Sequence, residues 1–251
     1  MEQIWLSEDH GTLRGVPFRF HNGNYENLRT TADEIVVLKR RFFMENYRAL
    51  AAHGPVRRML EVGVFQGGSS LLFADMFPEA KIVGIDWNQG NPEIQAHLER
   101  MGYADRVKLY WGVSQDDRAR IEGILRAEFE GEPLDWVVDD CSHLYSYTTK
   151  SFDVVYPHIR RGGFYALEDW GCVHKLGRAL PAYFFETEQK PLSAMVLELA
   201  MAAVCYPQSC ELSLTFQQAF VRKLNDLPPF EQLARPQSGA FDWVGFRPAT
   251  S

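Results

Sequence analysis

Two short apolar runs, each followed directly by acidic residues, constrain the fold of this chain more than any other feature. Residues 134–138 and 164–167 have the length and composition of strands buried on both faces of a parallel sheet. The polar residues that follow them are Asp139, Asp140 and His143 after the first run, and Glu168 and Asp169 after the second. If the two strands are neighbours, these side chains meet at the carboxyl edge of one sheet, where open α/β folds bind ligands.

The expected cluster contains more negative charge than a sheet edge tolerates by itself. Neighbouring carboxylates repel one another unless some are protonated or a cation lies among them. A hard divalent ion held by carboxylate oxygens, with the imidazole of His143 beside it to move a proton, is the simplest arrangement that makes the cluster tolerable. The sequence therefore predicts a metal site, and oxygen ligands favour magnesium, calcium or manganese over zinc.

Strands and helices alternate along most of the chain. The expected strands of this alternation are residues 58–63, 81–86, 107–111, 134–138 and 164–167, and the expected helices are residues 69–76, 92–101, 116–128 and 147–156. Such an alternation predicts a mostly parallel sheet with right-handed crossovers. The runs at 211–216 and 220–224 predict an antiparallel hairpin at the sheet edge. The expected fold is α/β and Rossmann-like, with a seven-stranded sheet.

The segments outside this alternation are expected to serve the core domain. Residues 1–30 are polar and irregular, which is typical of an arm or lid. Thr31 and Glu34 form a capping-box pattern that predicts a helix from Thr31 to about Ala52. The expected divisions are an N-terminal arm and helix that cap the substrate site at 1–56, a main domain at 57–230 with a variable insert at 171–208, and a C-terminal tail at 231–251.

A glycine-rich turn, Glu61-Val62-Gly63-Val64-Phe65-Gln66-Gly67-Gly68-Ser69, joins the first strand of the alternation to its helix. Glycines let the backbone turn tightly and approach a ligand. The dinucleotide fingerprint G-x-G-x-x-G does not fit, because Glu61 and Gln66 occupy two of its glycine positions. An acid here would repel a pyrophosphate but suits a cationic ligand. Asp86 ends the next strand, where a carboxylate can bind two ribose hydroxyls. The ligand should therefore carry a ribose and an amino or sulfonium group.

These residues resemble the class I methyltransferases, in which a motif of the form E-x-G-x-x-x-G-G binds the methionine end of S-adenosylmethionine. In that family an acid after the second strand binds the ribose, and the loop after the third strand lies near the adenine. The resemblance implies S-adenosylmethionine as cofactor. The cofactor contacts expected from it are Glu61, Gly63, Gly67, Ser69, Asp86, Trp87, Ser114, Gln115 and Asp139. For Asp139, a contact with the metal and a helix-capping role stay open as alternatives.

The acid cluster narrows this resemblance. The motifs Asp140-Cys141-Ser142-His143 and Glu168-Asp169 are similar to those of the metal-dependent O-methyltransferases of natural-product sugars, the macrocin and mycinamicin type. In those relatives a D-x-S-H motif and an E-D pair frame a magnesium ion. Carried over, the implied metal ligands are Asp140, Glu168 and Asp169, and the implied general base on a sugar hydroxyl is His143. A purely structural role for His143 in its loop is the alternative.

The resemblance implies a magnesium-dependent O-methyltransferase that acts on a sugar or a polyhydroxylated secondary metabolite. The runner-up is a catechol-type phenolic O-methyltransferase, which uses the same metal chemistry. A non-catalytic, cofactor-binding scaffold is a third reading, since fold alone does not establish function. The acid cluster disfavours the scaffold, because burying unpaired carboxylates destabilises a protein that has no use for them.

Composition restricts the partners. The net charge of −7, with no basic stripe, disfavours nucleic acid. The longest apolar stretch, residues 192–206, carries Glu198 and is too short to cross a bilayer. The four cysteines lack CxxC spacing, and the first residues lack a signal-peptide pattern. We expect a cytoplasmic protein with reduced thiols that acts on a small hydroxylated acceptor, and the apolar helix at 192–204 allows a homo-oligomer.

Overall fold

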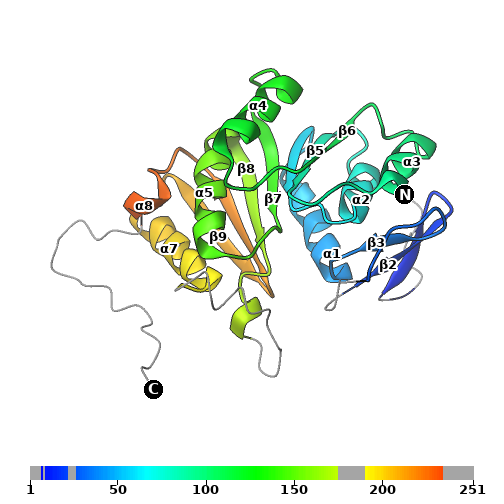
Figure 1. Ribbon diagram of the computed structural model, residues 1–251. Coiled ribbons are helices and arrows are strands. Elements are labelled where there is room, and N and C mark those ends of the chain that lie inside the picture. Colours follow the sequence, from blue (N-terminus) through cyan, green and yellow to red (C-terminus); the bar gives the residue numbers. More distant parts are fainter. Residues whose placement is uncertain (1–6, 8, 22–26, 175–189, 234–251) are drawn as a thin grey trace.

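A seven-stranded sheet forms the centre of the computed structural model, which describes residues 7, 9–21, 27–174 and 190–233. The strand order is β6-β5-β4-β7-β8-β10-β9 (Figure 1). The strands are β4 (Arg58–Val62), β5 (Lys81–Asp86), β6 (Val107–Trp111), β7 (Leu134–Asp139), β8 (Ile159–Glu168), β9 (Cys210–Thr215) and β10 (Gln218–Lys223). The first five pair in parallel, and β10 runs antiparallel to both β8 and β9. The predicted fold, including the edge hairpin, is confirmed.

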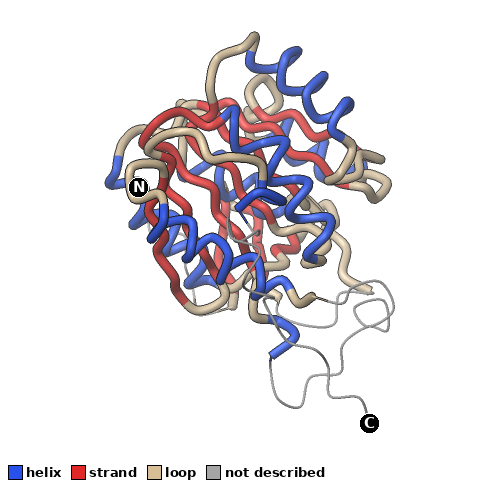
Figure 2. Tube along the Cα trace, turned by 90° about the vertical axis from the view of Figure 1, so that its left-hand side faces the viewer, coloured by secondary structure: helices blue, strands red, loops and turns tan. Residues whose placement is uncertain are grey.

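Helices cover both faces of this sheet, so that the strands lie between two helical layers (Figures 1 and 2). The helices on one face are α1 (Arg41–Leu50), α2 (Gly68–Met76) and α3 (Pro92–Arg100). Those on the other face are α4 (Arg118–Phe129), α5 (Tyr145–Val155), α7 (Leu192–Cys205) and the short α8 (Phe230–Leu233). Within the described ranges, 3₁₀ turns occur at Ala51–His53, Tyr156–His158 and Cys172–His174. Each layer has its own apolar core, which buries one face of every central strand.

The expectation of an irregular N-terminal arm is wrong for the residues that the structure describes. A second, three-stranded sheet lies here, formed by β1 (His10–Leu13), β2 (Val16–Phe20) and β3 (Ile35–Val37). Apolar side chains at alternate positions, such as Val16, Phe18 and Phe20, are buried in the same core as α1 and α2. This period-2 pattern is present in the sequence and is typical of a half-buried strand, but it covers only five residues of a segment that is otherwise polar.

The predicted helix start at Thr31 is also wrong. The Thr31 hydroxyl does accept hydrogen bonds from the backbone N–H groups of Asp33 and Glu34, as in a cap. The chain then extends into β3, because Ile35 and two following valines favour a strand and Ile35 pairs with Phe18 of β2. The helix begins only at α1, and its late start leaves Lys39 between a strand and a helix.

The apolar helix α7 matches its predicted position, and it keeps Leu197, Met201 and Val204 exposed on its outer side. No helix among the described residues has both the length and the apolarity needed to cross a membrane. Residues 175–189 of the predicted insert and nearly all of the predicted tail lie outside the described residues.

Candidate active site

Strand register decides which acidic side chains share a face of the sheet. Glu61 of β4 pairs with Val138, and Val138 pairs with Ala166, so these positions point to the same face. Glu168 lies two residues beyond Ala166 and therefore joins Glu61 on that face, under α1 and α2. Asp139 is one residue out of phase and points to the opposite face. Adjacent acids in the sequence thus enter different environments.

A buried set of charged groups, which we call the inner group, consists of Lys39, Tyr47, Glu61 and Glu168. The Lys39 ammonium donates to Glu168 Oε2 at 2.9 Å and lies 3.9 Å from Glu61 Oε1. The Tyr47 hydroxyl donates to Glu168 Oε1 at 2.5 Å. The side chains of Lys39, Glu61 and Glu168 are at most 2% exposed. Both oxygens of Glu168 therefore already have protein partners.

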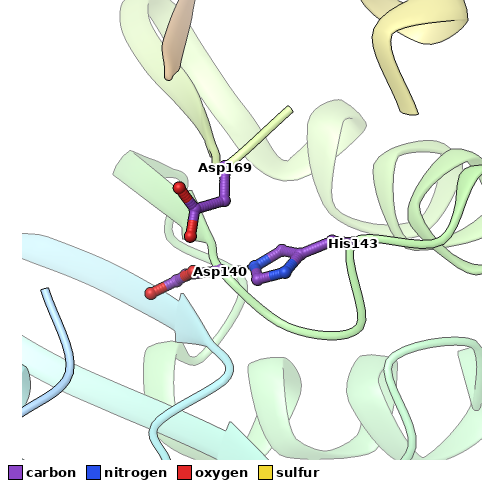
Figure 3. A group of neighbouring side chains, drawn as sticks. All are labelled: Asp140, His143 and Asp169. Atoms are coloured by element: carbon purple, nitrogen blue, oxygen red, sulfur yellow. Dashed lines mark hydrogen bonds and ion pairs between the residues drawn. The ribbon is translucent and has the colours of Figure 1, made fainter. Parts of the chain in front are cut away.

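Three partly exposed residues form what we call the outer group: Asp140, His143 and Asp169 (Figure 3). One ligand atom from each lies within 4.8 Å of the others. His143 Nε2 is 3.0 Å from Asp140 Oδ1, while Lys39 donates to Asp140 Oδ2 at 2.5 Å, so Asp140 joins the two groups. His143 and Asp169 have φ values of 58° and 50°. Such left-handed backbone is uncommon outside glycine and often marks functional sites.

The pKa values of these groups follow from burial and from Lys39. Burial would lower the pKa of Lys39, but the carboxylates of Asp140, Glu168 and Glu61 raise it above the ordinary lysine value. Burial raises the pKa of Glu168, and the charge of Asp140 adds to this effect against the opposing Lys39. For Asp140, burial is outweighed by Lys39 and by the hydrogen bond with His143, which together lower its pKa. Lys39 therefore keeps the Asp140 carboxylate ionised.

The His143 imidazole responds to the same charges. Burial would lower its pKa, but the hydrogen bond with Asp140 and the charges of Asp140 and Asp169 raise it above 6.5. The imidazole is thus oriented by one carboxylate and faces a second, an arrangement typical of a histidine that moves a proton.

Asp139 belongs to neither group, because its side chain points to the opposite face of the sheet. Its Oδ2 accepts a hydrogen bond from the Tyr165 hydroxyl at 2.7 Å, and burial raises its pKa to about 6. The structure places it on the face covered by α5, away from the inner group, so its predicted contact with the cofactor has no support from this placement. The alternative contact with a metal has none either, since the outer group lacks Asp139.

The glycine-rich loop lies directly against the outer group. Gly63 has a φ of 90°, and a Cβ there would lie 2.2 Å from the Asp140 carbonyl oxygen. Asp86 fixes the loop from the other side, since its Oδ2 accepts the N–H groups of Val64 and Phe65 at 2.8 and 2.7 Å. Gly67, with a φ of 78°, is the N-cap residue of α2. The predicted cofactor loop and the predicted metal cluster are therefore neighbours.

The remaining predicted cofactor residues line the adjoining edge of the sheet. Gln115 is buried, and its Oε1 accepts the Ser142 N–H at 2.9 Å, which ties the loop after β6 to the outer group. Ser114 donates to Asp116, Ser69 is buried, and Trp87 is 70% exposed. An exposed indole at a strand end can cover a ligand that binds there.

Lys39 and Tyr47 were not predicted from the sequence. Lys39 does follow an apolar run, residues 35–38, just as the acids follow theirs, and this signal could have been read as a strand end. The helix predicted across that run concealed it. Tyr47 sits at a helical position that seemed purely apolar, although its hydroxyl reaches Glu168.

The side chains at the site fit the magnesium ion and the cofactor that the sequence implies. Carboxylate oxygens of Asp140 and Asp169 are hard ligands, and magnesium completes its coordination with water. For the cofactor, Glu61 Oε1 and Gln115 Nε2 are buried and hydrogen bond to no described residue. Buried polar atoms normally have partners, so an acceptor and a donor are available here for a cationic amino group and an adenine.

Comparison with known proteins agrees with this geometry. Residues 60–170 match the family model described as a methyltransferase domain. The 8-demethyl-8-(2-methoxy-alpha-L-rhamnosyl)-tetracenomycin-C 3'-O-methyltransferase of Streptomyces olivaceus is 36% identical over 136 residues, which are 50% of this chain and 30% of that protein. The mycinamicin VI 2''-O-methyltransferase of Micromonospora griseorubida is 31% identical over 119 residues, 45% of this chain and 27% of that protein. The matches thus span less than a third of these two relatives.

Solved structures show the same fold. The MycE methyltransferase of the mycinamycin pathway, in complex with Mg and SAH, superposes with a TM-score of 0.55 at 23% identity, covering 74% of this chain and 52% of that one. The O-methyltransferase TomG of Streptomyces achromogenes, in complex with SAM, gives a TM-score of 0.54 at 16% identity, covering 76% and 82%. These structures confirm the predicted fold, and the match of residues 60–170 to the methyltransferase-domain model agrees with the resemblance carried by the motifs.

Proposed function

Since this chain carries a methyltransferase domain of the class I type, we propose that it transfers a methyl group from S-adenosylmethionine to a hydroxyl of a sugar or polyhydroxylated secondary metabolite, with the help of magnesium. The observation that carries the proposal is the convergence of Asp140, His143 and Asp169 directly beside the glycine-rich loop. Methyl transfer requires the acceptor oxygen, the methyl carbon and the sulfur in line, so both sites must adjoin.

The first task of the chain is to bind and orient the cofactor. In the proposal, Glu61 Oε1 accepts the amino group of the methionine end, and the loop around Gly63 lets this end approach the backbone. Asp86 faces the ribose while it holds the loop, and Gln115 donates to the adenine from its free Nε2.

The second task is to prepare the acceptor. A divalent ion held by Asp140 and Asp169, with Glu168 as the further ligand predicted from the resemblance, would supply the Lewis acidity that makes a sugar hydroxyl acidic enough to react. His143 removes the hydroxyl proton at Nδ1, while its Nε2–H donates to Asp140 Oδ1 and so orients the ring. Trp170, whose buried Nε1 hydrogen bonds to no described residue, follows Asp169 and can donate to the acceptor.

A sugar acceptor is supported by the names of two curated relatives, which describe a rhamnosyl-tetracenomycin and an L-olivosyl-oleandolide as their substrates. The decisive experiment follows a labelled methyl group from S-adenosylmethionine into a panel of glycosides and, separately, of catechols. The expected result is labelled glycoside, loss of labelling with excess chelator, and recovery with magnesium. Full labelling in excess chelator would contradict the role of the ion, and labelling of catechols alone would favour the phenolic alternative.

A further inference from the structure

We propose that Lys39 is a positioning residue that sets the affinity of the candidate active site for divalent ions, by competing with the ion for Asp140 and Glu168. The inference rests on the proposed function, because it concerns the ion that this function uses. The Lys39 ammonium donates to Asp140 Oδ2 at 2.5 Å and to Glu168 Oε2 at 2.9 Å. It thereby holds one oxygen from each of two predicted metal ligands.

The N-terminal sheet fixes Lys39 in this place. Lys39 follows β3, and β3 lies against the first turn of α2, where a Cβ on Gly68 would be 2.1 Å from the Val36 carbonyl oxygen. The Lys39 side chain is only 2% exposed, so it approaches the carboxylates from inside the protein. A divalent ion among Asp140, His143 and Asp169 would lie on the outer, partly exposed side of the same Asp140 carboxylate.

Two cations that share buried carboxylates repel each other, because water and salt screen their charges only weakly there. The ammonium therefore opposes the ion at Asp140 and withholds Glu168 from it. Glu61 Oε1 lies 3.9 Å from Lys39 Nζ and hydrogen bonds to no described residue. When no cofactor is bound, it offers the ammonium an alternative partner after the ion takes Asp140.

A purely structural role for Lys39, as a counter-charge for the inner group, would also explain its burial. Both roles predict lower stability when the charge is removed, so stability cannot separate them. They differ in the affinity for an ion. Competition predicts that removing the ammonium strengthens ion binding, whereas a structural role predicts unchanged or weaker binding.

The test is a titration of the full chain with Mn²⁺, in which electron paramagnetic resonance measures the free ion. Lys39→Met should lower the Kd for Mn²⁺ by about tenfold or more, because an opposing charge within a few ångströms is lost. Lys39→Arg retains the charge and should stay within about threefold of the wild type. Lys223→Met is the matched control, since Lys223 is also buried but donates to the carbonyls of Tyr156 and Pro157 and pairs with the exposed Asp226, which is not a predicted metal ligand.

A Kd for Lys39→Met that equals or exceeds the wild-type value would overturn the proposal. If this variant fails to fold, Lys39→Gln, which keeps an N–H donor without the charge, carries the same expectation. The proposed function fails in a different way. In that case neither the wild-type chain nor any of the variants at residue 39 binds Mn²⁺.

Discussion

The inner and outer groups differ in how their charges are satisfied, although they lie at the same edge of the same sheet. Glu168, in the inner group, receives hydrogen bonds from Lys39 and Tyr47 and is 1% exposed. Asp169, the next residue, belongs to the partly exposed outer group. Among the described residues, no side chain forms a hydrogen bond or ion pair with its carboxylate. The Glu168 carboxylate is thus neutralised by the protein itself, whereas the Asp169 carboxylate remains available to a ligand.

Two neighbouring acids, Glu168 and Asp169, can therefore have different roles. A buried charge that loses its partner destabilises the fold strongly, whereas a partly exposed charge can remain available at little expense in stability. We therefore expect mutations in the inner group to act mainly on stability, and mutations in the outer group to act mainly on turnover and ion binding.

The largest effect is expected from His143→Ala, on turnover. Removal of a positioned general base should lower kcat by about 10²–10⁴-fold, with little change in melting temperature. His174→Ala is a control, because His174 is exposed and its imidazole hydrogen bonds only to Ser193 among the described residues. Steady-state kinetics with the labelled cofactor measures the effect. A variant that keeps more than about a third of the wild-type rate would show that another group takes the proton.

The next effect is expected from Lys39→Met, on stability. Loss of the ammonium leaves buried carboxylates unpaired, which should lower the free energy of unfolding by about 3–5 kcal/mol in buffer without divalent ions. Chemical denaturation measures this change. Lys190→Met removes an exposed ion pair with Glu198 and should change stability by less than about 1 kcal/mol. Equal losses of stability from the two mutations would show that the buried charge contributes no more to stability than the exposed one.

Tyr47→Phe should have a smaller effect on the same group. Its hydroxyl is a buried donor to Glu168, and loss of this bond should lower the free energy of unfolding by about 1–3 kcal/mol. Tyr110→Phe removes a comparable hydrogen bond to Glu128 near the surface and should have the weaker effect. A stability loss that is no larger for Tyr47→Phe would mean that the inner group does not depend on this donor.

Asp86→Ala should weaken binding of the cofactor and leave the inner and outer groups unchanged. Loss of the charged acceptor for the ribose should weaken binding of S-adenosylmethionine by about 1–3 kcal/mol, as measured by calorimetry. Affinity for Mn²⁺ should be retained, because Asp86 contacts the loop at Val64 and Phe65 and not the outer group. Unchanged cofactor affinity would remove Asp86 from the binding site.

The smallest effect on stability is expected from Asp169→Asn. The free energy of unfolding should change by no more than about 0.5 kcal/mol, as for other substitutions outside a buried network. Affinity for Mn²⁺ should nevertheless fall, because the outer group loses a charged ligand. Denaturation and ion titration of the same preparation give both values. A large loss of stability would show that Asp169, like Glu168, mainly stabilises the fold.

The sheet could be predicted because its strands are apolar runs with clear ends. The expected strands at 81–86 and 107–111 match β5 and β6 residue for residue. β8 begins earlier than expected, because the polar pair Arg160 and Arg161 and two glycines hid its first half. At the site, the sequence indicated the acids and His143, but it left the direction of the His143 pKa shift open.

The partition into inner and outer groups could not be predicted, because it depends on a contact from a distant part of the chain. Lys39 reaches Asp140 across 101 sequence positions, and its approach requires that residues 35–37 form a strand and not a helix. The local capping pattern at Thr31 predicted a helix through these residues. Pairing with β2 and burial against α2 overrode it, as tertiary contacts often override local propensity.

The most direct test of the central claim is a crystal of the wild-type chain soaked with Mn²⁺ and measured at the manganese absorption edge. We expect one anomalous peak among Asp140, His143 and Asp169, with carboxylate oxygens of Asp140 and Asp169 at about 2.0–2.3 Å, and a Lys39 ammonium displaced from Asp140. No anomalous peak at this edge of the sheet, with Lys39 still bonded to Asp140 and Glu168, would contradict it.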